Sequence, residues 1–194
     1  MIGLMYEHME NKVLATASVV VETDAMKQTT DATGKQALGA MTRLVYHPAI
    51  ERGNIFHIGI STGIEGARYS SDESQNHKLF TLTTRLPMRV AKVNAQEAIV
   101  NDAKLMYKFS PEVLYSYDRF SIVGQYFWNR ITRDNGLHSF TGSGAYVTLR
   151  GLIKGRNYSY TKTDGGIATP DPGNMEICLQ YNYTSLSDAS AGLY

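Results

Sequence analysis

The chain has 194 residues, 43% of them hydrophobic, and 19 Lys and Arg against 18 Asp and Glu give a formal net charge of +1. It has no run of about 18 apolar residues, which excludes a transmembrane helix, and a near-neutral charge gives no reason to expect a nucleic-acid partner. The composition of 13 Tyr, 17 Gly and 5 Pro suits a sheet protein with aromatic side chains and glycine-marked turns. The length fits a single domain, or one portion of a larger one.

The first two elements are predicted to be strands at 3–7 and 13–22. They flank Met9-Glu10-Asn11-Lys12, a plausible hairpin turn. The second segment is rich in β-branched residues and carries no helical spacing, which favours a strand.

Three further segments, 37–47, 54–61 and 78–85, alternate apolar and polar residues with a period of two, the pattern of a strand with two different faces. The first is expected to end at Pro48, because proline cannot donate to a ladder. Residues 90–99 break the pattern and are predicted to form either a short helix or a loop folded inward.

Residues 102–110 alternate again, and Pro111 is expected to separate them from a short strand at 112–117. A tight turn at 118–119 then leads into 121–132. That last segment has two competing apolar faces: Ile122, Tyr126 and Trp128 on one, and Val123, Phe127 and Ile131 on the other. A strand that contacts a neighbouring subunit, or one covered by an inner loop, would have this pattern.

The clearest alternation lies at 144–155. Its apolar face holds Ala145, Val147, Leu149 and Ile153, and its polar face holds Tyr146, Thr148, Arg150 and Lys154. Its length of about a dozen residues exceeds the usual strand and matches the roughly 9–11 tilted residues that cross a bilayer. A last strand is predicted at 174–187.

Tight turns at some joins and long polar loops at others are typical of a barrel. The fold class is therefore predicted as all-β, an antiparallel transmembrane β-barrel, with nine or ten strands in a single partial domain over 1–194. A soluble antiparallel sandwich or small barrel that binds a ligand or a glycan is the alternative, because it has the same alternation.

Basic residues gather on the faces opposite the apolar ones. They are Arg43, Arg85, Lys104, Lys108, Arg150 and Lys154, with Glu176 as the acid on those faces and His57 as a titratable neighbour. Lys and Arg around a pore select anions, so these six residues are predicted to line an anion path; the alternative is that they are ordinary charges in an unselective pore. The residues Tyr46, Tyr107, Tyr126, Tyr181 and Tyr183 are candidates for aromatic belts at the membrane interfaces.

No catalytic or metal-binding arrangement is expected. The sequence offers no Ser–His–Asp or paired-carboxylate context, and Glu112 and Glu176 are interpreted as polar groups of the lumen. Five scattered His and the single Cys178 give no reason to expect a metal, a cofactor or a disulfide. The first residues lack a basic segment and a cleavage site, so no signal peptide is predicted within them.

Four motifs resemble, in order, segments of the phosphate-selective porins O and P. They are Leu44-Val-Tyr-His-Pro48 with Phe56-His-Ile-Gly-Ile-Ser61, Phe120-Ser-Ile-Val-Gly-Gln-Tyr126, Gly144-Ala-Tyr-Val147 with Leu152-Ile-Lys-Gly155, and Gly173 to Tyr183.

The resemblance implies a porin of about sixteen strands in the bacterial outer membrane, in contact with its lipid and usually a homotrimer. Such a channel passes small anions such as phosphate through a lumen lined by Arg and Lys. Gln125 and Gln180 stand where this family often has Glu and Arg, and the second departure weakens the case for a phosphate site at that point. The comparison also suggests a fragment without the N-terminal strands and the last hairpin.

Overall fold

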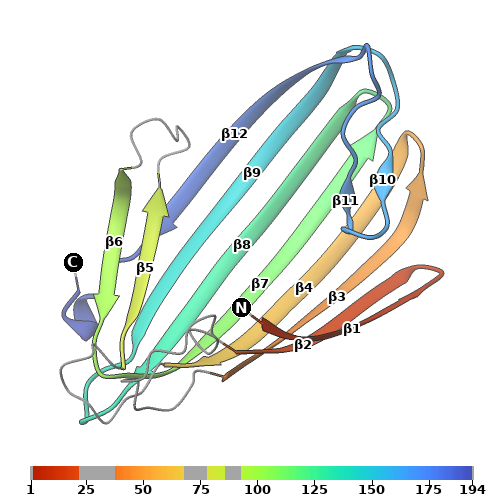
Figure 1. The fold of residues 1–194 in the computed structure, drawn as a ribbon. Coiled ribbons are helices and arrows are strands. Elements are labelled where there is room, and N and C mark those ends of the chain that lie inside the picture. The colour runs from red at the N-terminus through yellow and green to blue at the C-terminus, as the bar shows by residue number, and fades with distance from the viewer. Residues whose placement is uncertain (1, 22–37, 68–77, 86–92, 194) are drawn as a thin grey trace.

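The computed structural model describes residues 2–21, 38–67, 78–85 and 93–193. Eight antiparallel strands form one curved sheet in the order β1-β2-β3-β4-β7-β8-β9-β12 (Figure 1). They are β1 (Ile2–Glu10), β2 (Val13–Val21), β3 (Leu38–Glu51), β4 (Asn54–Gly66), β7 (Ala103–Tyr117), β8 (Phe120–Arg133), β9 (Phe140–Lys154) and β12 (Met175–Ser185).

Four shorter strands make two separate hairpins, β5 (Phe80–Arg85) with β6 (Asn94–Val100), and β10 (Tyr160–Thr161) with β11 (Gly166–Ile167). A 3₁₀ turn, η2 (Ala189–Ala191), follows β12. The antiparallel all-β prediction is confirmed. Across the described residues β1 and β12 are the two edges of the sheet, which is therefore not closed into a ring.

One face of this sheet is apolar and open to its surroundings. On β9, Leu149 is 47% exposed, and on β12, Leu179 is 69% exposed. No second large sheet covers this face in the described part of the chain, as the soluble sandwich would require. We call it the outer face, and the opposite one the inner face.

Three joins are hairpins with two-residue turns, and all three lie at the same end of the sheet. They follow β1, β3 and β7, with Asn11 (φ 43°), Gly53 (φ 82°) and Asp118 (φ 47°) in the left-handed region that such turns need. We call this the short-turn end. The connections after β2, β4 and β8 lie at the opposite, long-loop end.

The two prolines do not end strands, so both boundaries predicted at them are wrong. β3 continues past Pro48 because its register shifts between Tyr46 and Ala49, and a bulge tolerates a residue without an N–H. β7 continues past Pro111, where the Ser110 hydroxyl donates to the Tyr126 carbonyl at 2.8 Å. A side chain thus satisfies the neighbouring strand where the proline offers no donor.

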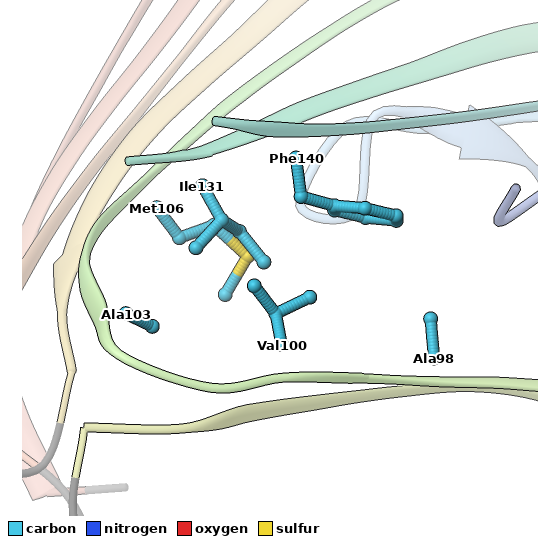
Figure 2. Packing of buried hydrophobic residues seen from close by; sticks show 6 residues of the cluster. All are labelled: Ala98, Val100, Ala103, Met106, Ile131 and Phe140. Atoms are coloured by element: carbon cyan, nitrogen blue, oxygen red, sulfur yellow. The ribbon is translucent and has the colours of Figure 1, made fainter. Parts of the chain in front are cut away.

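The β5–β6 hairpin folds over the inner face near the long-loop end. Figure 2 shows Ala98 and Val100 of β6 opposite Met106, Ile131 and Phe140 of the wall, and all five are buried. Asn94–Val100 is therefore a strand within an inward-folded segment rather than a helix.

The segment 155–174, which contains β10 and β11, covers the inner face near the short-turn end (Figure 1). Tyr158, Tyr160 and Ile167 of this segment pack against wall residues Ile55, Leu114 and Leu152.

The β5–β6 hairpin and segment 155–174 together explain why β8 has apolar residues on both faces. Ile122 and Tyr126 lie exposed on the outer face, while Val123 and Ile131 pack under the inner segments.

Candidate functional site: the inner face of the sheet

Three of the six cations predicted for the anion path lie on the inner face of the wall, Arg43 on β3, Lys108 on β7 and Arg150 on β9. Lys104 on β7 and Lys154 on β9 lie at shifts of the strand register, so the alternation does not place them on that face. The sixth, Arg85, ends β5, and its side chain lies outside the described part of the structure. The strand register brings three of these cations against acidic side chains.

Arg43 is the centre of the first cluster. Its Nη2 and Nε donate to Glu112 Oε1 at 2.6 and 2.8 Å, and the same oxygen lies 3.2 Å from His57 Nε2. Arg43 also donates to two backbone carbonyls of segment 155–174, those of Asp164 at 3.0 Å and Gly165 at 3.3 Å. One guanidinium therefore joins strands β3 and β7 to the inner segment.

Tyr160 fastens the same segment from β10. Its hydroxyl is 2.9 Å from Nδ1 of His57, a side chain only 2% exposed. Burial raises the pKa of Tyr160 to about 12, because a phenolate would lose its hydration there. The phenol thus stays neutral, and its contact with His57 is a hydrogen bond rather than an ion pair.

Glycine makes room for this cluster. A Cβ on Gly59 would lie 2.5 Å from Glu112 Oε1, and one on Gly165 would lie 3.3 Å from the Arg43 guanidinium. Gly165 also has φ +60°, a conformation that favours glycine. The position of the Glu112 carboxylate depends on the missing side chain at Gly59, and the close approach of the inner segment to Arg43 depends on the one at Gly165.

Two more ion pairs occupy the inner face. Arg150 Nε and Nη2 donate to the Glu176 carboxylate at 2.6 and 3.1 Å, and the Tyr158 hydroxyl donates to the same carboxylate at 2.8 Å. Lys108 Nζ lies 2.5 Å from Glu65 Oε2. Arg150, Lys108 and Arg43 are thus each balanced by one carboxylate.

Lys104 and Lys154 differ from those three. Both are exposed, and among the described residues neither has an acidic side chain within ion-pair distance. Lys104 lies at the start of β7, near the long-loop end, and Lys154 lies at the end of β9, near the short-turn end. The two cations without a described partner therefore stand at opposite ends of the wall.

Sequence reasoning missed the acidic partners. It ended the fourth strand at Ser61, so Glu65 fell in a predicted loop, although Glu65 shares the parity of His57 and Ser61. Glu112 and Glu176 are predicted as polar lumen groups, but their partners follow only from register, which places Glu176 diagonally from Arg150 and Glu112 across β4 from Arg43. The alternation that places Glu65 on the same face as His57 and Ser61 was the one feature of the sequence that could have predicted an acidic partner.

The outer face carries aromatic rings toward both ends of its strands. On β7, Tyr107 lies toward the long-loop end, and Tyr115 and Tyr117 lie beside the short turn. The apolar Val113 lies between these two groups of rings. Aromatic girdles flanking an apolar band mark the two interfaces of a membrane-spanning barrel.

Other kinds of site are not found where the structure describes the chain. No group of three or more His, Cys, Asp or Glu side chains there is arranged to hold a metal ion. The same residues include no helix of the length and apolarity that crossing a membrane requires.

A meandering antiparallel sheet with an apolar, ring-flanked outer face and a polar, charged inner face is the wall of an outer-membrane β-barrel. Residues 1–192 match the model of the family "Phosphate-selective porin O and P", and the chain belongs to this family of outer-membrane porins. No curated protein matches the sequence.

Proposed function

We propose that this protein is a passive diffusion channel of the bacterial outer membrane that favours small anions such as phosphate. The proposed path runs along the inner face past Arg43, Arg85, Lys104, Lys108, Arg150 and Lys154. The observation that carries the proposal is an exposed lysine at each end of the wall, Lys104 and Lys154, for which the described residues offer no acidic partner. No catalytic role is proposed, because the family is one of channels.

The two kinds of cation have different tasks in this proposal. Lys104 and Lys154 attract anions toward the two mouths, since low-dielectric walls focus the field of a fixed charge. Arg43 donates its hydrogen bonds to Glu112 and to two backbone carbonyls. It therefore positions the inner segment and adds little net charge to the proposed path. Weak attraction at several places, without tight binding at one, is what permeation needs.

The surroundings follow from the same proposal. The exposed apolar outer face contacts outer-membrane lipid, and the resemblance to the family supports a homotrimer. The backbone groups of edge strands in lipid need partners, so a closed ladder is a requirement of the proposed channel.

The test is the zero-current reversal potential of the reconstituted protein in a planar bilayer under a KCl gradient. We expect the sign for chloride permeation, and a smaller potential for Lys104→Gln and Lys154→Gln. Charge reversal, Lys104→Glu, lowers it further. Lys12→Glu, in the turn between β1 and β2, is the matched control and leaves the potential nearly unchanged. An unselective or cation-selective channel would refute the anion mechanism while leaving the porin class intact.

A further inference from the structure

A recess lies on a part of the inner face where the described residues carry no charge. It has a volume of about 740 Å³ and lies between the β5–β6 hairpin and the wall formed by β8, β9 and β12. None of the described residues that line it is Lys, Arg, Asp, Glu or His. Its volume falls within the roughly 300–1,000 Å³ of small-ligand sites.

Two aromatic rings form one wall of this recess. Phe127 and Tyr146 are paired with their centroids 6.0 Å apart and an interplanar angle of 32°. The Tyr146 hydroxyl donates to Gln125 Oε1 at 3.0 Å, and the Gln125 amide donates to Ser110 Oγ at 2.9 Å. This chain of hydrogen bonds holds the Tyr146 ring in place, so it presents a fixed apolar surface.

Carboxamides form the polar part of the lining. The Gln180 amide donates to Asn182 Oδ1 at 2.8 Å. That bond leaves the Gln180 oxygen and the Asn182 amide group without another side-chain bond among the described residues. Gln96 of β6 faces the recess from the opposite side. A carboxamide both donates and accepts hydrogen bonds.

We propose that this recess binds a neutral, polyhydroxylated solute, a mono- or disaccharide, within the channel. Sugar hydroxyls both donate and accept and therefore match carboxamides, while the C–H face of a pyranose ring packs against an aromatic ring. An anion gains nothing from the described lining, because it offers no cation to compensate the lost hydration. The inference rests on the proposed channel function for its physiological use, and extends it to uncharged solutes.

The charged clusters lie beside this recess on the inner face. Arg43 and Glu112 belong to β3 and β7. Arg150 and Glu176 belong to β9 and β12, which also line the recess, but they lie nearer the short-turn end than Tyr146 does. The ionic side of the wall therefore adjoins the neutral recess, and two classes of solute follow different surfaces of one pore.

The test uses maltose as the probe and polyethylene glycol of the same hydrodynamic size as the control. In single-channel recordings, maltose is expected to produce resolvable current interruptions that polyethylene glycol does not. Tyr146→Ala and Asn182→Ala should each raise the half-blocking concentration about three- to tenfold. Tyr107→Ala, an outer-face tyrosine, is the matched control and leaves it unchanged. Equal block by the two solutes, or an unchanged block in Tyr146→Ala, would overturn the proposal.

A binding measurement separates this inference from the proposed function. Saturation-transfer NMR on the detergent-solubilised protein reports maltose binding whether or not the protein conducts. Binding without channel activity would retain the sugar site and refute the channel, and channel activity without binding would do the reverse. Inorganic phosphate is expected not to displace maltose; competitive displacement would place the sugar on the ionic side and overturn the assignment.

Discussion

Replacing Glu112 by Gln should destabilise the protein by leaving Arg43 without its counter-charge. Exposed ion pairs contribute about 0–1 kcal/mol, and breaking a buried one costs about 3–5 kcal/mol. The side chains of Arg43 and Glu112 are 27% and 14% exposed, which places this pair between the two limits. We therefore expect Glu112→Gln to lower the free energy of unfolding by about 2 kcal/mol.

The assay is the temperature at which the detergent-solubilised protein loses its folded, heat-modifiable band on a gel. For a chain of this size, about 2 kcal/mol corresponds to a fall of roughly 4–8 °C. Adding Arg43→Met to Glu112→Gln should recover part of the loss, because the stranded charge is then removed.

A matched ion pair supplies the control. Arg52 and Asp171 also join the wall to segment 155–174, but their side chains are 57% and 52% exposed. Asp171→Asn should therefore cost less than about 1 kcal/mol. If Glu112→Gln and Asp171→Asn unfold at the same temperature, partial burial does not strengthen the Arg43–Glu112 pair and the reasoning fails.

Three further predictions concern stability. Gly59→Ala should lower the unfolding midpoint by the equivalent of about 1–3 kcal/mol, because its Cβ would lie 2.5 Å from Glu112 Oε1; an unchanged midpoint would show that the carboxylate has room to move. Asp188 accepts hydrogen bonds from the Ser190 side chain and backbone and from Thr141 N, and these lower its pKa from 3.8. Asp188→Ala should cost about 1 kcal/mol at neutral pH and progressively less as pH falls below 3.8 through the folded-state pKa; a cost that persists in acid would contradict this. Because burial raises the pKa of Tyr160 from 10.0 to about 12, its contribution is complete below pH 10 and is lost as pH rises toward 12. Tyr160→Phe should therefore lose less stability between those two pH values than the parent protein does, as measured by unfolding midpoints in alkaline buffers.

The alternation of residues was enough to predict the wall but not its inner coverings. In 144–155 a period of two identifies both faces of β9 as far as Leu152, where the register shifts, and the structure confirms the exposed apolar side. The same rule failed at Pro48 and Pro111, because a bulge and a Ser110 hydroxyl compensate for the missing N–H. Such compensation depends on the neighbouring strand, which a single segment does not reveal.

The charges illustrate a second limit. Parity places Arg43 and Arg150 on the inner face, but whether a cation acts as a free charge depends on what the neighbouring strands place beside it. Arg43 on β3 and Glu112 on β7 are separated by 69 residues and lie on either side of β4, and register alone brings them together. Residues 158–173 are polar and rich in Gly and Pro, and the packing of this segment against Ile55 and Leu114 follows from tertiary contacts that its composition does not encode.

The order of the strands has a consequence for how the protein assembles. The strands of the main sheet pair in the order in which they occur in the chain. The sheet can therefore form by adding one strand at a time. Each two-residue turn closes a short loop at small entropic cost. The two inner hairpins have no surface to dock on until β7, β8 and β9 are in place. They should therefore be the last parts of the chain to gain protection from hydrogen exchange during refolding, and the wall the first.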